Sequence, residues 1–424
     1  MDLMRTSWVE GLFDLQNPYL GGTMRIAVLS DPNNFHTQKW VKALQKAGAE
    51  VVVMSFDPSN ATEFEAIQLK PPVGRGKGYS YLDYLRGGNV LAMALKEHRI
   101  DVLNPLNVTP FGVWAMQSAF HPVVACAFGA DILEYPPDYH RSNAAQGRSW
   151  DALTHKSTRI ERWKSRLKYR FYRKKVAQAL QNADWVTGDN QYLVDCMAEW
   201  FAVPRAKMEV LRWGVEPELF EVNEAELQKT RALFSIQPLQ KVVLSPRGLK
   251  PIYQADIILE SFARLLEQGH QDTVFIMLGA GYAVSPEVSI RAEKLAKSYP
   301  NFRYVKTALP RETMHALWRL TDVFVSAPVY DGYSAALAEG RYVGAIPVVN
   351  DIPAHRELIL HGQNGWICHP FTADKLHHDL EHLLQHTAEF HSTFAQTNRE
   401  WILQHSLMET NARRFLEIVS LRCL

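Results

Sequence analysis

The stretch Val323–Pro370, VFVSAPVYDGYSAALAEGRYVGAIPVVNDIPAHRELILHGQNGWICHP, decides the fold of the C-terminal half of this 424-residue chain. It begins with the short apolar segment Val323–Ala327, which predicts a buried strand. An Asp-Gly turn then leads into the Ala- and Leu-rich segment Ser334–Tyr342, which predicts a helix ended by a glycine. Ala345–Val349 predicts the next strand. The order strand, helix, strand indicates a βαβ unit of a parallel sheet.

Two carboxylates frame the N-terminus of this predicted helix. Asp331 precedes the helix and Glu339 lies about two turns inside it, because seven residues separate the two. The helix end between them offers free N–H groups and a positive dipole end, which both suit a phosphate. Carboxylates accept hydrogen bonds from sugar hydroxyls. The segment therefore indicates a nucleotide-sugar site.

The segment resembles the donor-binding signature of the retaining GT-B glycosyltransferases (glycosyl transferases group 1, family 4-like). That signature is an acidic residue, seven residues and Glu, followed by a small-residue turn, Pro-Val-Val and a later Asn-Gly. The matching residues are Asp331, Glu339, Gly344, Pro347-Val348-Val349 and Asn364-Gly365. The family commonly has Glu as the first acid, and often Gly where this chain has Ser334. An ordinary βαβ unit with acidic surface residues is the alternative.

The composition fits a globular protein of two or three domains. Hydrophobic residues make up 47% of the chain, and a net charge of +1 gives no field that points to nucleic acid. The four Cys form no CxxC pair, which predicts a reducing compartment and no zinc or disulfide framework. Residues 1–23 lack the basic start and apolar run of a signal peptide. We therefore expect a cytoplasmic protein.

Both halves of the chain alternate apolar strands with helices, which predicts parallel sheets covered on both faces. In the first half, strands are expected at Met24–Ser30, Ala49–Ser55, Asp101–Leu106, Val123–Ala127 and Trp185–Gly188, and helices at His36–Ala47 and from about Phe111. In the second half, strands are expected at Lys241–Ser245, Thr273–Leu278 and Phe302–Val305, and helices at Gln254–Gln268, Glu287–Ser298 and Thr313–Leu320.

These patterns predict an α/β protein with two doubly wound Rossmann-like domains that face a cleft, the GT-B fold that the resemblance implies. The expected divisions are an N-terminal extension at 1–23, an acceptor-side domain at 24–213, a nucleotide-sugar domain at 214–397 and a crossover helix at 398–424. One long helix is expected over Asn398–Leu421 and, as in the family, it crosses back onto the first domain. The ligand is expected between the domains, at the carboxyl ends of the strands.

On the donor side, the resemblance implies that a basic pair and a helix N-terminus, rather than a metal ion, stabilise the leaving diphosphate. The candidates for the pair are Arg247 and Lys250, which are three apart where the family usually has a spacing of five. Glu339 is implied as the ribose ligand, and Asp331 as the partner of the donor-sugar hydroxyls. Gly332, Tyr333 and Ser334 are expected to present N–H groups, although Ser334 is equally well explained as an N-cap.

Gly279 and Gly281 follow a predicted strand and allow close approach of the backbone to a donor. A dinucleotide fingerprint requires a third glycine at position 284, where this chain has Val284. An NAD-dependent oxidoreductase is therefore a weak alternative.

On the acceptor side, Asp131 follows Gly129 in the turn that resembles the family's Gly-any-Asp, and we group it with Asp331 and Glu339 as catalytic candidates. His36 and Asn107 are the other acceptor-side candidates. The family often has a His at the end of the strand that carries Asn107, and a Gly-Gly after the first strand; this chain has neither. These departures keep open a GT-B-like protein that binds a nucleotide sugar without transferring it. A nucleotide-sugar epimerase is a further alternative.

Two further patterns concern metals and membranes. His378, His382 and His386 lie four apart on a predicted helix opposite its Leu face, which fits a solvated row better than a metal site. The segment Lys156–Lys175 holds ten Lys or Arg and one acid, with Ile160, Trp163, Leu167 and Phe171 at helical spacing. We expect peripheral contact with an anionic membrane through it, and packing of the stripe on the domain is the alternative.

We therefore predict a cytoplasmic, metal-independent, retaining glycosyltransferase without a cofactor other than its nucleotide-sugar co-substrate. Its acceptor is expected to be a glycan, a lipid-linked molecule or a small molecule with a hydroxyl group. Synthesis of a glycan, a glycolipid or an envelope polysaccharide fits this chemistry, and no nucleic-acid partner is expected.

Overall fold

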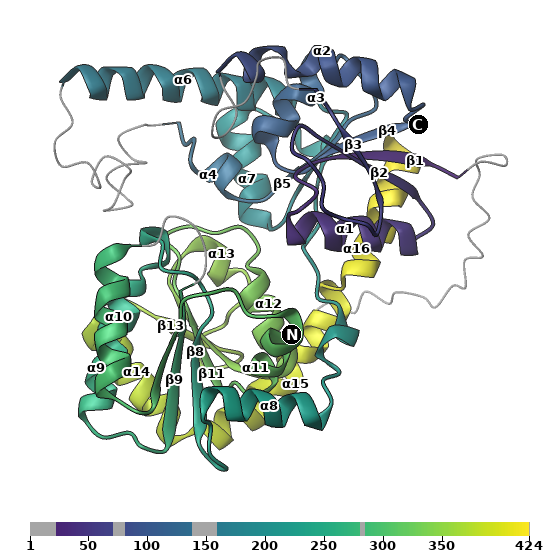
Figure 1. Ribbon diagram of the computed structural model, residues 1–424. Helices are drawn as coiled ribbons and strands as arrows, with labels where there is room; N and C mark the ends of the chain where they lie inside the picture. Colours follow the sequence, from purple (N-terminus) through teal and green to yellow (C-terminus); the bar gives the residue numbers. More distant parts are fainter. Residues whose placement is uncertain (1–22, 71–80, 138–158, 280–284, 424) are drawn as a thin grey trace, which may run out of the picture.

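The computed structural model describes residues 23–70, 81–137, 159–279 and 285–423, and it shows two α/β domains (Figure 1). Each domain is built on parallel strands with helices packed on both faces. The predicted fold class is confirmed. Among the described residues, none of the helices is long and apolar enough to cross a membrane.

The strands of the N-terminal domain form two sheets that continue one another. The first has the order β3 (Glu65–Gln68), β2 (Glu50–Ser55), β1 (Arg25–Leu29), β4 (Val102–Pro105). The second has the order β5 (Val124–Ala127), β6 (Trp185–Gly188), β7 (Met208–Val210). Parallel bridges from Leu103 to Val123 and from Leu106 to Cys126 join β4 to β5. The helices are α1 (Phe35–Lys46), α2 (Tyr81–Glu97), α3 (Val113–Gln117), α4 (Ala130–Leu133), α6 (Arg159–Asn182) and α7 (Gln191–Phe201), with short turns η1 (Val108–Gly112) and η2 (Arg205–Lys207).

The C-terminal domain has one six-stranded parallel sheet. Its order is β10 (Phe302–Val305), β9 (Thr273–Leu278), β8 (Lys241–Ser245), β11 (Val323–Ser326), β12 (Ile346–Asn350), β13 (Trp366–Cys368). The helices are α8 (Glu224–Phe234), α9 (Ala255–Glu267), α10 (Pro286–Ser298), α11 (Arg311–Arg319), α12 (Ala335–Val343), α13 (Pro353–Arg356) and α14 (Ala373–Gln385), with the turns η3 (Pro217–Phe220) and η4 (Pro251–Tyr253).

The strand orders place a topological switch point in each domain. The chain runs from β8 outward to β10 and returns at β11, so β8 and β11 are neighbours whose connections leave in opposite directions. The same relation holds for β1 and β4. Ligands of open α/β sheets bind at the carboxyl ends of such strands. The loops that follow these four strands therefore define where a site is expected.

Helix α12 begins and ends close to the residues that the sequence predicts. Ser334 is the N-cap, and its side chain accepts a hydrogen bond from the N–H of Leu337. Gly344 ends the helix with φ of 90°, a left-handed conformation that glycine adopts without the steric cost of a side chain.

The prediction of one long C-terminal helix over Asn398–Leu421 was wrong. The chain forms α15 (Thr387–His405) and then, after a break at Ser406, α16 (Met408–Ile418) and the turn η5 (Val419–Cys423). At the break, Val215 donates to the Ser406 carbonyl (2.8 Å) and accepts from the Met408 N–H (3.1 Å). Val215 lies where the chain first passes from the N-terminal to the C-terminal domain. Its two hydrogen bonds take the place of bonds that a continuous helix would make. α16 then packs on α1 of the N-terminal domain, so the expected return to the first domain is confirmed (Figure 1).

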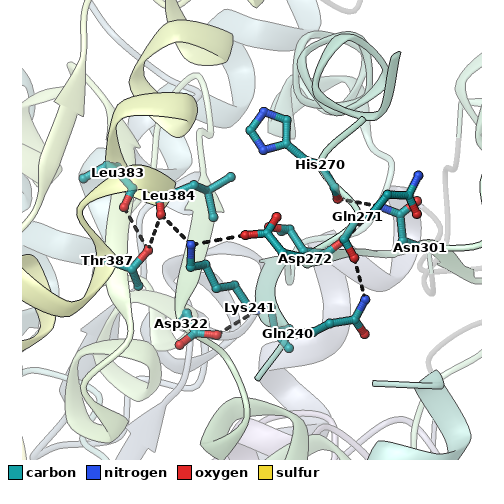
Figure 2. Close-up of polar contacts among 12 residues, drawn as sticks. Gln240, Lys241, His270, Gln271, Asp272, Asn301, Asp322, Leu383, Leu384 and Thr387 are labelled. Carbon is teal, nitrogen blue, oxygen red and sulfur yellow. Dashed lines mark hydrogen bonds and ion pairs between the residues drawn. The ribbon is translucent and has the colours of Figure 1, made fainter. Parts of the chain in front are cut away.

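Polar contacts within the domain close the opposite, amino ends of the C-terminal strands (Figure 2). Lys241 Nζ donates to the Leu384 carbonyl at 2.8 Å, which ties the start of β8 to the end of α14. Gln240 Nε2 donates to the Gln271 carbonyl at 2.7 Å. These contacts lie at the edge of the sheet opposite the switch points and join its amino ends to the rest of the domain.

Candidate functional site

A cavity of about 400 Å³ lies between the domains at both switch points. Its N-terminal wall comes from the loops after β1, β4, β5 and β6, and its C-terminal wall from the loops after β8 and β11. Seven of its lining residues carry the argument below: Asn34, His36, Asn107, Asp189, Arg247, Asp331 and Ser334. Several residues predicted from the sequence thus line the same cavity to which the switch points of the two sheets lead.

Arg247 is the cation of the C-terminal wall. Its Nη1 donates to Asp331 Oδ2 and to Ser334 Oγ, each at 2.8 Å, and its guanidinium lies 4.3 Å from the ring centroid of Tyr253. Burial disfavours the charged guanidinium, but Asp331 and Tyr253 together outweigh the effect of burial and raise the pKa of Arg247. The group is therefore a fixed positive charge, held in a planar geometry that suits bidentate contact with a phosphate.

The first turn of α12 adds anion-binding groups beside this cation. Ala335 and Ala336 line the cavity at the helix N-terminus, where backbone N–H groups have no intrahelical partner. Helix dipole and N–H groups both favour an anion there. Tyr333 also borders the cavity, but its hydroxyl lies 2.6 Å from Ser406 Oγ in the α15–α16 break. The Tyr333 side chain thus anchors the loop after β11 to the α15–α16 break.

His36 faces the cavity from the first turn of α1. Asn34 caps this helix by accepting a hydrogen bond from the His36 N–H at 2.8 Å. Desolvation by the cleft walls lowers the pKa of His36 to about 4, and the positive charges of Lys39 and Arg247 act in the same direction. The imidazole is therefore neutral at pH 7 and becomes charged only as the pH falls towards 4. A neutral imidazole can both donate and accept a hydrogen bond.

Asn107 lines the cavity with an unusual backbone. Its φ is 78° with ψ of 137°, a region that non-glycine residues rarely occupy. Its N–H donates to the Cys126 carbonyl at 2.9 Å, which helps to hold the conformation. Strained residues of this kind gather at functional sites.

Asp189 is an acidic cavity residue that sequence reasoning missed. It directly follows β6, is 2% exposed and accepts a hydrogen bond from the N–H of Tyr333 in the other domain. Burial raises its pKa well above the usual value, with Asp331 and Asp131 acting in the same direction. The available signal was an acid directly after the apolar segment Trp185–Gly188, at the carboxyl end of a predicted strand.

The domains touch at the floor of this site. A Cβ added to Gly129 would lie 2.7 Å from the Gly332 nitrogen, so the two glycine backbones are in contact. Nearby, the Glu357 carboxylate accepts hydrogen bonds from the Gln191 N–H (2.8 Å) and from Arg212 (2.8 Å). The first of these bonds places an acid of the C-terminal domain at the N-terminus of α7. The mutual position of the two walls is thus set by direct contacts.

Several predicted residues lie outside the cavity lining. Asp131 is buried and accepts from the N–H groups of Val108 (2.8 Å) and Phe128 (3.0 Å), so it holds together the loops after β4 and β5. Burial raises its pKa to about 6 despite these bonds. Glu339 accepts from Trp318 Nε1 at 3.0 Å, and burial raises its pKa.

Lys250 directly precedes η4 and is not among the residues that line the cavity. Gly279 follows β9 against Tyr304, whose ring would be 2.4 Å from an added Cβ. Gly281 and Val284 lie outside the described residues.

Potential metal ligands gather elsewhere. Within the described part of the chain, one group of acids and histidines, His377, His378 and Glu381 on α14, has ligand atoms within 4.8 Å of one another, and none of the three lines the cavity. His378 and His382 on α14, and His386 directly after it, are exposed, as the solvated-row interpretation predicts.

Comparison with protein-family models gives two matches. Residues 228–401 match the family described as glycosyl transferases group 1, and residues 25–157 match the family described as glycosyl transferase 4-like. The first match spans most of the C-terminal domain, and the second spans the N-terminal domain up to the residues before α6. None of the curated protein sequences matches the chain significantly.

Solved structures with the same fold cover nearly the whole chain. A glycosyltransferase from Rickettsia africae superposes with a TM-score of 0.70 at 13% identity, covering 94% of this chain and 98% of its own. A sucrose-phosphate synthase from Thermosynechococcus elongatus gives 0.70 at 14% identity, covering 93% and 98%. HepE from Anabaena, solved with UDP and glucose, gives 0.69 at 15% identity, covering 94% and 99%. At these identities the likeness shows the fold.

Proposed function

The chain belongs to the group 1 glycosyltransferases, and from that premise we propose that it transfers a sugar from a nucleoside diphosphate sugar to a hydroxyl acceptor, with retention of configuration and without a metal ion. The observation that carries this proposal is the arrangement of Arg247, Asp331 and the α12 N-terminus at the switch point of the C-terminal sheet. It combines a fixed cation and free N–H groups with a carboxylate, as a sugar diphosphate requires.

In the proposed reaction, the leaving diphosphate binds between Arg247 and the first turn of α12. Charge builds on the diphosphate as the sugar bond breaks, so a fixed cation and oriented N–H groups favour the transition state. Asp331 accepts hydrogen bonds from the donor-sugar hydroxyls once the diphosphate has taken over part of its contact with Arg247. Glu339, whose Oε2 accepts from Trp318, is proposed to hold the ribose through its other carboxylate oxygen.

The acceptor hydroxyl is proposed to enter against the N-terminal wall. Neutral His36 and the side chain of Asn107 face the cavity there and can orient it by hydrogen bonds. Asp131 would act as a positioning residue through the two loops that it holds. A glycan, a lipid-linked molecule or a small molecule meets these requirements, and synthesis of a glycan, glycolipid or envelope polysaccharide is the proposed setting.

A test of the reaction uses UDP-glucose, because the HepE structures hold UDP and UDP-glucose. In the absence of an acceptor, water accepts the sugar, and proton NMR identifies the glucose anomer that forms first. We expect α-glucose, with a rate that is unchanged by EDTA. If UDP-glucose is inert, the other sugar nucleotides follow in the same assay. β-Glucose would contradict retention, and loss of the reaction in EDTA would contradict metal independence. No turnover with any donor would favour a sugar-nucleotide-binding protein that lacks transfer.

A further inference from the structure

Helix α6 extends beyond the body of the N-terminal domain. Its C-terminal part packs in the domain core through Val176, Ala179 and Leu180, whereas its N-terminal part projects past the neighbouring helices (Figure 1). The helix has 24 residues, so it is about 36 Å long. Within the described part of the chain, the N-terminal part of this polar helix therefore presents a surface that the domain core does not cover.

The apolar stripe of α6 is divided between packing and exposure. Phe171 is half-buried against the core of the domain. Trp163 and Leu167 are 63% and 55% exposed, and their spacing of four residues makes them neighbours on the surface of the helix. The structure does not describe the side chain of Ile160 or residues 156–158. Packing on the domain therefore accounts for the C-terminal end of the stripe and leaves Trp163 and Leu167 unexplained.

Cations share the face of these two apolar side chains. At about 100° per residue, Trp163, Leu167, Arg170 and Lys174 fall within about 60° of arc on one side of the helix. Arg170 and Lys174 are exposed, and the buried Val176 projects from the opposite side. The stretch from Trp163 to Lys175 contains no acid. The face therefore combines an aromatic and an aliphatic anchor with positive charge.

We propose that this face of α6, defined by Trp163, Leu167, Arg170 and Lys174, docks the protein on an anionic lipid bilayer. Its charge complements lipid phosphates, and a tryptophan and a leucine can enter the boundary between headgroups and acyl chains. A helix that lies in this plane needs an apolar side with cations beside it, which is the composition found here. The inference does not rest on the proposed sugar transfer.

The test is co-sedimentation of the full chain with vesicles of phosphatidylcholine alone or mixed with phosphatidylglycerol. The wild type is expected to bind only the mixed vesicles, and less as salt is added. The double variant Arg170→Gln/Lys174→Gln is expected to bind about 25-fold more weakly, because each cation near an anionic surface contributes about a factor of five. The double variant Trp163→Ala/Leu167→Ala is expected to lose roughly tenfold or more through its missing apolar anchors.

Matched controls change similar groups on the other domain. Lys294→Gln/Lys297→Gln removes two exposed cations of α10, and Leu239→Ala removes an apolar side chain that is 98% exposed. Both controls are expected to bind as the wild type does. Failure of the wild type to bind mixed vesicles would overturn the proposal. An α6 double variant that binds mixed vesicles as strongly as the wild type would also overturn it. So would binding to RNA instead of vesicles, if that binding depended on Arg170 and Lys174 in the same way.

Discussion

Replacing Arg247 by Gln is expected to lower kcat for sugar transfer by about 100- to 1000-fold, the range found when one fixed donor to a developing negative charge is removed. Arg247 is the guanidinium that joins Asp331 and Ser334 at the cavity wall. Gln is shorter and uncharged, so it cannot neutralise a departing diphosphate. The measurement is steady-state kinetics on the donor identified in the UDP-glucose assay, with calorimetric titration of UDP as the second readout.

Lys250→Gln provides the matched control for the loss of charge. Lys250 lies three residues away in the same loop but outside the cavity lining, so this variant is expected to keep a kcat close to that of the wild type. Arg247→Lys is expected to recover part of the activity, because it restores the charge without the planar fork. Equal effects of the Arg247→Gln and Lys250→Gln changes would show that general loop charge, and not the Arg247 contact, matters.

Gly332→Ala is expected to lower kcat by about 100-fold while it leaves UDP affinity nearly unchanged. A Cβ at this position would lie 2.3 Å from Asp189 Oδ2 and 2.7 Å from the Phe128 carbonyl oxygen, both in the opposite domain. The backbone oxygen has little freedom to withdraw, so the walls must separate. A misplacement of about 1 Å between reacting groups costs about 100-fold in rate. The Arg247–Asp331 pair lies within one domain and is expected to survive.

The control for this variant is Gly112→Ala, where an added methyl group meets Val108 at 3.5 Å, an ordinary contact distance. Its kcat is expected to stay near that of the wild type. Comparison of both variants by kinetics and by UDP titration separates poor alignment of the walls from loss of the donor site. A Gly332→Ala enzyme with full kcat would show that the domains do not react in the arrangement seen here.

Local signals explain why the α12 region was predicted so closely. The N-cap at Ser334 and the left-handed Gly344 are determined by residues within one short segment. The same local rules placed Arg247 and Asp331 in the loops that follow two strands. Parallel pairing of β8 with β11 then brings the two together, and the expected neighbourhood follows from topology.

Long-range contacts explain what the sequence did not predict. Asp131 and Asp189 both follow buried strands, but only the fold decides that Asp131 turns to the N–H groups of neighbouring loops and Asp189 to the cleft. Glu339 is paired with Trp318, a partner on a separate helix. The break at Ser406 depends on Val215, which lies far away in the chain. Helical periodicity carries no information about any of these partners.

The most direct test of the central claim, a nucleoside diphosphate site between Arg247 and α12, is a thermal-shift measurement with UDP, GDP, ADP and NAD. A ligand that binds only the folded protein stabilises it by about 2.7 kcal/mol at a concentration of 100 times Kd. We predict a clear rise in Tm with one nucleoside diphosphate, and a much smaller rise with Arg247→Gln. Stabilisation by NAD alone, or by none of the four, would contradict the account.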